Sequence, residues 1–293
     1  MKCLQSVRNG ELLELLAWGQ GELLRAGIEE GREECERVMM KLLRCSRAEL
    51  FLKEHETDPS GIRNRFLEIL EKRTKRVPLA YLLKETDFWH ETLLVDERCL
   101  IPRPETEILV EQVLKNIGEM KKEKFSFLDL GTGSGAIAIA ILRACGNATA
   151  TMTDISGGAL EAAFENLKRY GLENRAEIVP SDLFRAFTDP KKWDLIVSNP
   201  PYLSEKDLKE AQEELRYEPR MALDGGKDGL DFYRAIIAQA KDLLTAGGLI
   251  GFEVGAGQAE TVSKWFQEAG YDNIQRFRDH LGIERVVMAR RKN

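Results

Sequence analysis

Residues 127–142 read FLDLGTGSGAIAIAIL, a short apolar run, three alternating glycines and a second apolar run. The first run, 127–130, has the character of a strand buried on both faces, and 136–142 that of a buried helix. Glycine permits tight turns and close backbone approach, and the N–H groups at a helix start face whatever binds there. The stretch therefore predicts a strand, a ligand-binding loop and a helix in an α/β protein.

The rest of the chain beyond this unit alternates between strand-like and helix-like stretches. Further strands are expected at 148–154, 177–179, 193–198, 249–254, 274–277 and 285–289. Helices are expected at 158–170, 230–244 and 259–269. Such alternation predicts a doubly wound, mostly parallel, seven-stranded sheet. Ligands of such sheets bind at the carboxyl ends of the strands, where the strand order reverses.

The first part of the chain has helical periodicity. From about Val7 to Lys84, leucines recur at helix-like spacing, with a break at 58–61. We predict a helical bundle over residues 1–84, a linker hairpin over 85–104 and a second domain over 105–293. The last helix of the bundle carries six basic residues, Arg63, Arg65, Lys72, Arg73, Lys75 and Arg76. They form either a solvated face or a docking face for an acidic or RNA-associated partner.

The bulk composition narrows the class of protein. Lys plus Arg is 43 and Asp plus Glu is 49, a net charge of -6, which disfavours a long nucleic acid as main partner. The five cysteines are scattered without C-x-x-C spacing, as expected of free thiols in a reducing compartment. His55, His90 and His280 are far apart in sequence, so we expect no metal site. No apolar run is near 18 residues, so we expect no membrane span. The free thiols favour a cytoplasmic location, and we expect a monomer because nothing in the sequence demands more.

The glycine loop differs from a dinucleotide fingerprint because no third glycine falls at the required spacing. Asp154 ends the next strand, where a carboxylate can accept both hydroxyls of a ribose. Asp129, before the loop, suits a cofactor with a cationic amino-acid end. Asp182 can accept the adenine amino group, and Leu183 can pack on the ring. Together these features predict S-adenosylmethionine as cofactor.

The expected cofactor contacts are Asp129, Gly131, Thr132, Gly133, Ser134, Gly135, Asp154, Asp182, Leu183 and Asn199. Two of the carboxylates also have purely structural interpretations. Asp154 can cap the following helix, and Asp182 can be an exposed loop residue or an N-cap.

Asn199-Pro200-Pro201-Tyr202 follows the apolar strand at 193–198. Two prolines fix the backbone and remove two N–H groups, which displays the carbonyls as acceptors. A planar NH2 group can donate to the Asn199 side-chain oxygen and to the Pro200 carbonyl. These two hydrogen bonds would orient one face of the nitrogen toward the methyl donor, and they would stabilise the positive charge that the nitrogen acquires during transfer. Tyr202 can stack on that group. The run predicts methylation of an amide-type nitrogen. We expect Asn199, Pro200 and Tyr202 to be catalytic and all four residues of the run to bind substrate. Alternatively, the Asn-Pro-Pro-Tyr run has no catalytic role and only terminates the strand.

Five motifs resemble, as a set, the release-factor glutamine methyltransferases (the PrmC/HemK family). They are LIPRPETE at 100–107, DLGTGSG at 129–135, DIS at 154–156, SNPPY at 198–202 and EPRMALDGGKDGL at 218–230. The resemblance implies a class I S-adenosylmethionine methyltransferase fold. It implies methylation of N5 of the glutamine in the Gly-Gly-Gln loop of class 1 peptide chain release factors. It also implies that the helical domain and the hairpin grip the release factor.

The chain departs from the family pattern at Lys84, and in Trp89-His90-Glu91, where glycines are usual.

Other interpretations of the function stay open. A nucleic-acid amino-methyltransferase, acting on adenine N6 or guanine N2, requires a basic face and a base-recognition insert. A non-catalytic binding module predicts degraded motifs, and a nicotinamide oxidoreductase predicts a complete dinucleotide fingerprint. Arg103, Glu105 and Glu107 form either a helix-start network or part of the substrate channel. Glu253 and Gln258 are similarly ambiguous.

Overall fold

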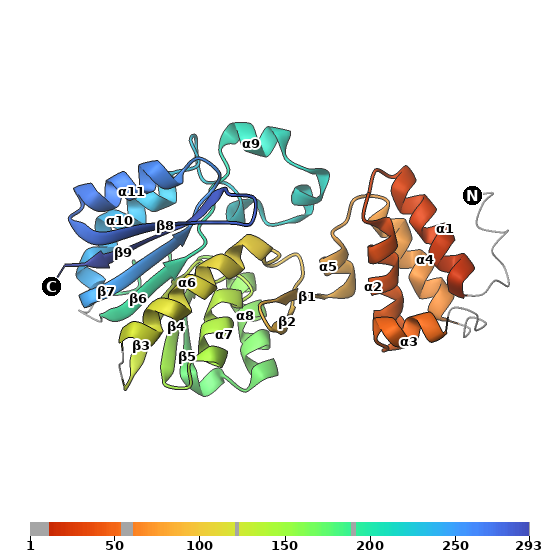
Figure 1. The fold of residues 1–293 in the computed structure, drawn as a ribbon, viewed down its shortest axis with the longest axis horizontal. Coiled ribbons are helices and arrows are strands. Elements are labelled where there is room, and N and C mark those ends of the chain that lie inside the picture. The colour runs from red at the N-terminus through yellow and green to blue at the C-terminus, as the bar shows by residue number, and fades with distance from the viewer. Residues whose placement is uncertain (1–11, 54–60, 121–122, 189–191, 293) are drawn as a thin grey trace. The chain divides into compact units, whose positions relative to one another are not determined.

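The computed structural model describes residues 12–53, 61–120, 123–188 and 192–292, and the chain divides into two units, Met1–Lys84 and Glu85–Asn293 (Figure 1). The expected start of the helical pattern near Val7, the break at 58–60 and His55 lie outside the described residues.

The first unit is a helical bundle. Its helices are α1 (Leu12–Arg25), α2 (Gly31–Leu43), α3 (Arg47–Leu52), α4 (Ile62–Arg73) and α5 (Leu79–Leu83). Leu15, Met39, Phe66 and Leu70 are buried together in its core. The spacing of these apolar residues on each helix explains why the helices form only as a packed group.

The six basic residues expected on the last helix lie on α4 and just after it, since α4 ends at Arg73 and Lys75 and Arg76 follow it. They divide into internal and exposed ones. Arg73 is buried and donates from Nε and Nη2 to the Glu34 carboxylate, over 2.7 and 3.1 Å. Arg76 donates to the Gly27 carbonyl over 2.9 Å. Arg65 and Lys72 are exposed. Two of the six basic side chains therefore stabilise the bundle and are not part of a solvated face.

The second unit contains the predicted seven-stranded sheet. Its strands are β3 (Phe125–Leu130), β4 (Ala148–Asp154), β5 (Ala176–Pro180), β6 (Trp193–Ser198), β7 (Leu244–Glu253), β8 (Tyr271–Arg278) and β9 (Glu284–Arg291). They lie in the order β5-β4-β3-β6-β7-β9-β8, with β9 antiparallel to both neighbours and the other pairs parallel (Figure 1). The expected fold class is confirmed, and β7 begins five residues before the expected strand at 249.

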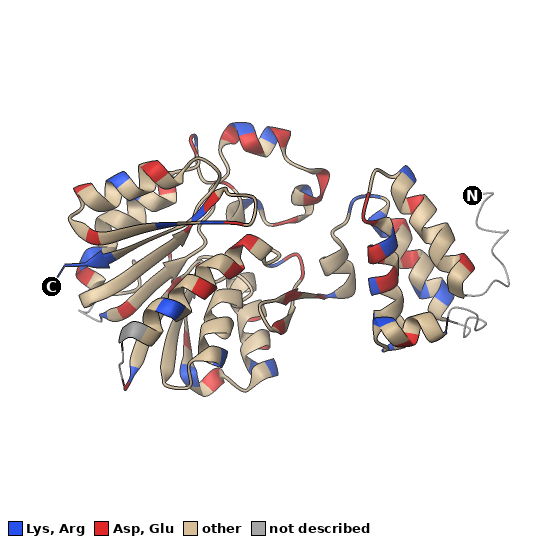
Figure 2. Ribbon diagram, in the orientation of Figure 1, with Lys and Arg blue, Asp and Glu red and all other residues tan. Residues whose placement is uncertain are grey.

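Helices cover both faces of this sheet, which is why its central strands are apolar throughout. One core combines Phe127 and Val197 with α6 (Pro104–Met120), α7 (Ala136–Ala144) and α8 (Gly157–Tyr170). The other combines Leu128 and Ile196 with α10 (Asp231–Leu243) and α11 (Ala259–Glu268). Short helices, including α9 (Glu205–Glu210) and two 3-10 helices (Glu213–Tyr217 and Arg220–Ala222), follow β6. Basic and acidic positions are interspersed along the helices (Figure 2).

The hairpin of β1 (Glu85–Phe88) and β2 (Glu91–Leu94) is fastened to α8. The Asn166 side chain accepts from Leu94 N (2.7 Å) and donates to Leu94 O (2.9 Å). Lys84, and Trp89 in the 89–91 run that lacks the glycine expected from the resemblance, have φ of 60° and 58°. The chain thus keeps the left-handed turns without glycine, at about 1–2 kcal/mol each.

Within the part of the chain that the structure describes, no helix is both long and apolar enough to cross a membrane.

Candidate functional site

The site lies where β3, β4 and β6 end side by side. Leu130 pairs with Thr153 of β4 and with Ser198 of β6, and the Ser198 hydroxyl donates to the Leu130 carbonyl over 2.7 Å. The carboxyl ends of the three strands are therefore held in register, and the loops that follow them meet at one edge of the sheet.

The glycine loop between β3 and α7 leaves space for a ligand. Gly131 and Gly133 have φ of 68° and 55°, line a cavity of about 240 Å³, and a Cβ added at either meets nothing within 4 Å. Gly135 also has positive φ, 83°, but a Cβ there lies 3.0 Å from Met152 Cε. The first two glycines therefore keep the backbone open to the cavity, and the third permits close packing.

Asp154 forms one wall of this cavity. Its Oδ2 accepts from Gly133 N over 3.0 Å and its Oδ1 from Ser156 N over 2.9 Å, and burial raises its pKa. A carboxylate oxygen can accept more than one hydrogen bond, so both oxygens can also accept ligand hydroxyls. The helix cap that was an alternative role for Asp154 belongs to Ser156, whose hydroxyl accepts from Ala159 N at the start of α8.

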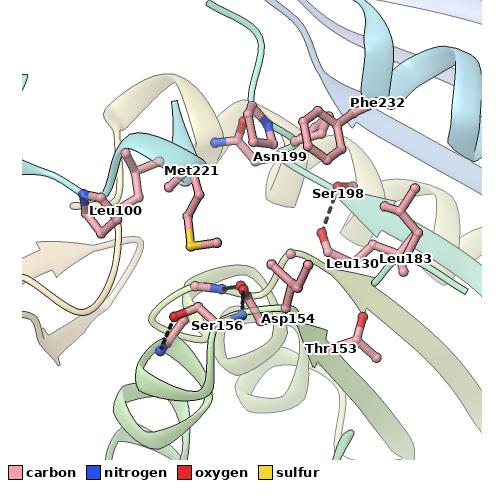
Figure 3. A pocket seen from close by; sticks show the side chains of 18 of the residues that line it. Leu100, Leu130, Thr153, Asp154, Ser156, Leu183, Ser198, Asn199, Met221 and Phe232 are labelled. Carbon is pink, nitrogen blue, oxygen red and sulfur yellow. Dashed lines mark hydrogen bonds between the residues drawn. The ribbon is translucent and has the colours of Figure 1, made fainter. Parts of the chain in front are cut away.

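Asp182 and Leu183 also line the cavity, as do Asn199, Pro200 and Pro201. The Asp182 side chain is 41% exposed and forms an ion pair with Arg185 over 2.7 Å. Figure 3 shows Asn199 on one side of the cavity and Asp154 on the opposite side.

Four expected cofactor residues lie outside the cavity lining, namely Asp129, Thr132, Ser134 and Gly135. Asp129 is fully buried and its Oδ2 accepts from the Thr132 hydroxyl over 2.7 Å, and burial raises its pKa to about 7. The Ser134 carbonyl accepts from Asn166 over 3.0 Å. The geometry therefore gives these residues a role in shaping the loop, because a buried carboxylate fixes the turn from behind.

Several apolar residues of the cavity had not been singled out from the sequence. Leu100, Met221 and Phe232 line it (Figure 3), and so do Ile155 and Ile236. Of these, Leu100, Ile155 and Met221 fall inside the quoted motifs, whereas Phe232 and Ile236 stand on an ordinary amphipathic helix. Apolar periodicity alone cannot separate a core residue from a cavity wall.

A second cavity, of about 300 Å³, shares residues with the first. Leu100, Ala222, Asn199 and Pro200 line both, and Tyr202 and Arg103 line only the second. Asn199 and Pro200 therefore form part of a partition between two chambers. Asn199 and Pro200, like Leu100 and Ala222, are therefore accessible from both chambers.

A buried polar network lies behind this partition. Asn199 Nδ2 donates to Thr106 Oγ1 over 3.1 Å, and Thr106 Oγ1 donates to Glu253 Oε2. The Tyr202 hydroxyl donates to Glu253 Oε1 over 3.4 Å. Burial raises the pKa of Glu253 to about 7, and burial also raises the pKa of Tyr202. The sequence left Glu253 ambiguous and did not single out Thr106.

The 218–230 segment clamps the Asn199–Tyr202 loop by backbone contact. A Cβ on Gly225 would lie 2.7 Å from the Pro201 carbonyl oxygen, and one on Gly229 2.3 Å from that of Tyr202. Gln258 Nε2 donates to the Tyr202 carbonyl over 3.0 Å. This motif therefore sets the position of the loop.

Glu218 links two of the quoted motifs. Its buried carboxylate accepts from Ile101 N over 3.0 Å and pairs with Arg103. Arg103 lines the second cavity, and its backbone carbonyl accepts from Thr106 N at the start of α6 over 3.0 Å, so its position fits both roles considered for it.

The sheet order, the glycine loop after β3 and the Asp154 wall define a class I S-adenosylmethionine-dependent methyltransferase fold. A solved methyltransferase from Pyrococcus furiosus shares this fold, with a TM-score of 0.52 and 18% identity over 69% of this chain and 89% of that chain.

Sequence comparison specifies the family. Residues 104–226 match the model of the methyltransferase small domain, and residues 14–83 match the PrmC N-terminal domain. The release factor glutamine methyltransferase of Geobacter sulfurreducens is 37% identical over 94% of this chain and 95% of its own. The release factor glutamine methyltransferase of Coxiella burnetii is 38% identical over 89% of this chain and 92% of its own length. The chain belongs to the release factor glutamine methyltransferase family, and the expected enzyme class is confirmed.

Proposed function

We propose that this protein transfers a methyl group from S-adenosylmethionine to the side-chain N5 of the glutamine in the Gly-Gly-Gln loop of peptide chain release factors. The relatives' names support the reaction. The structural observation that carries it is the position of Asn199 and Pro200 between two chambers. Methyl transfer requires donor and acceptor to meet in line, and this partition is where they would meet.

The first chamber fits the proposed cofactor. Asp154 presents buried carboxylate oxygens for the ribose hydroxyls, and Gly131 and Gly133 leave room for close backbone approach. Leu183 and Phe232 supply apolar surface for the adenine ring, with Asp182 at the exposed edge. When bound, S-adenosylmethionine supplies an electrophilic methyl group on a sulfonium.

In the second chamber, the glutamine amide would donate both N–H groups to protein acceptors. Asn199 Oδ1 and the Pro200 carbonyl are suitable, because Pro201 contributes no N–H that would compete. An amide nitrogen is a weak nucleophile, and two fixed acceptors stabilise the positive charge that it acquires. Tyr202, from the same loop, would stack on the amide and exclude water. Transfer would break the S–CH3 bond and form the N–CH3 bond, and S-adenosylhomocysteine would leave neutral. The methylated nitrogen, which is then cationic and acidic, would lose one proton to water, so the scheme assigns no protein base and no metal.

For the helical unit, residues 1–84, we propose a role in binding the release factor. The family match of this region and the exposed cations Arg65 and Lys72 support it. We further propose that the protein acts as a monomer in the cytoplasm, where release factors work.

The decisive experiment compares two acceptors. The purified protein is incubated with methyl-labelled S-adenosylmethionine and either a release factor or its variant with alanine in place of the Gly-Gly-Gln glutamine. We expect label in the first protein only. Label in both, or in neither, would overturn the proposal. Parallel incubations with RNA and DNA test the amino-methyltransferase alternative, which predicts label in nucleic acid.

A further inference from the structure

The buried network behind Asn199 joins three elements that are distant in sequence. Thr106 lies in the first turn of α6, Glu253 ends β7, and Asn199 follows β6. The Thr106 and Glu253 side chains are buried, at 3% and 1% exposure. Buried polar groups in such an arrangement persist only where each hydrogen bond has a partner of the correct kind.

The direction of each hydrogen bond in this network follows from the groups available. When Glu253 is ionised, its carboxylate only accepts, so Thr106 gives its single hydroxyl proton to Glu253. The Thr106 oxygen then has only lone pairs left for Asn199. Of the two ends of the Asn199 amide, only Nδ2 can donate to it. The amide is thereby fixed with Nδ2 toward Thr106 and Oδ1 on its other side.

We infer that Thr106 and Glu253 are positioning residues that select one of the two orientations of the Asn199 amide. The inference rests on the proposed function, and it explains why the site would select a glutamine amide over a carboxylate as the group to be methylated. With Oδ1 presented, the site receives a group that donates, such as the glutamine NH2. With Nδ2 presented, it receives a group that accepts, such as a carboxylate.

Glu253 also fixes the second side chain of the loop. The Tyr202 hydroxyl donates to the carboxylate oxygen that Thr106 does not use. One carboxylate therefore holds both the hydrogen-bonding residue and the stacking residue of the acceptor chamber. Neither Thr106 nor Glu253 lines either cavity, so their effect is indirect.

The test replaces Thr106 by valine, which keeps its shape and removes the hydroxyl, and by serine, which restores it. Binding is measured for two release factors, one with the Gly-Gly-Gln glutamine and one with glutamate in its place. Turnover and cofactor affinity are measured alongside. Thr151→Val is the matched control, because Thr151 is buried and its hydroxyl accepts from Trp193 Nε1, away from Asn199.

We expect Thr106→Val to reduce turnover by roughly tenfold or more, and to reduce the binding preference for glutamine over glutamate by a similar factor. A tenfold change corresponds to the free energy of about one hydrogen bond. Cofactor affinity should be unchanged, and Thr106→Ser should recover most of both losses. A Thr106→Val protein that binds both release factors more weakly by the same factor, or an equal loss of preference in Thr151→Val, would overturn the inference. Failure of the proposed function is separate, since it appears as no methylation and no glutamine preference in the unaltered protein.

Discussion

The backbone N–H of Gly133 donates to the Asp154 carboxylate over 3.0 Å, which joins the loop after β3 to the end of β4. The same carboxylate accepts from Ser156 N and faces the first chamber. One side chain therefore shapes the proposed cofactor site and presents acceptors to it.

We expect Asp154→Asn to weaken S-adenosylmethionine binding by roughly 10- to 100-fold, since a charged acceptor shared by ribose hydroxyls becomes a neutral amide. Titration calorimetry with the cofactor measures the change. At saturating cofactor, turnover should be largely retained. Unaltered affinity would show that the ribose lies elsewhere.

Asn199→Ala should reduce turnover by roughly 10²- to 10³-fold, because one of the two acceptors for the amide nitrogen is lost. Cofactor affinity should be kept. Single-turnover methylation of a release factor and calorimetry give the two quantities, and exposed Asn174→Ala serves as control. An equal loss of cofactor affinity would place the main role of Asn199 in the first chamber.

Gly229→Ala should strongly reduce activity because its Cβ would lie 2.3 Å from the Tyr202 carbonyl oxygen and must displace the loop. Gly171→Ala is a matched control, with a similar φ (65° against 75°) and nothing within 4 Å of the added carbon. Both variants carry the same backbone strain, so thermal unfolding and turnover of the pair separate strain from displacement. Equal turnover in the two would contradict the clamp.

Turnover should rise with pH through about 7, because only ionised Glu253 gives the hydrogen bond from Thr106 a fixed direction. The groups that face this carboxyl are Glu105 and Thr106 of α6, Tyr202 and Arg285, and Tyr233 donates to its backbone carbonyl. In Glu253→Gln, whose amide does not titrate, the rise between about pH 6 and 8 should disappear. An identical profile in both proteins would exclude Glu253 as its source.

Stability should fall as pH rises from the ordinary pKa values of Glu253 and Asp129 to about 7. The pKa of Glu253 and that of Asp129 are both raised to about 7 in the folded protein, from ordinary values of 4.5 and 3.8. The folded state therefore holds these protons longer than the unfolded state. Their contribution to stability is full below the ordinary pKa values and is lost as pH rises through about 7. Denaturant titrations at several pH values, with and without Glu253→Gln, measure it.

Charge reversal of Arg65 and Lys72 together should raise the KM for release factor by roughly three- to tenfold and leave kcat unchanged. Exposed Lys264→Glu on α11 is the control. An unchanged KM in the double variant, or the same increase in the control, would argue against docking through the helical unit.

The sequence by itself determined the sheet, because strands buried on both faces and amphipathic helices leave distinct periodicities. It also placed Gly131, Gly133, Asp154 and Asn199 at strand ends, which parallel strands bring to one edge. Lys84 and Trp89 departed from the resembling family, yet both turns form, since a lysine or a tryptophan can adopt a left-handed conformation at modest cost.

Only the tertiary structure decided which of these residues face a cavity. Asp129 lies near the end of β3 and Asp154 ends β4, yet Asp129 is fully buried behind the glycine loop and Asp154 lines the first chamber. Local pattern gives no signal for this difference, nor for the pairing of Asn199 with Thr106, 93 positions away. Such contacts depend on how strands and helices pack, and packing joins residues that no sequence interval relates.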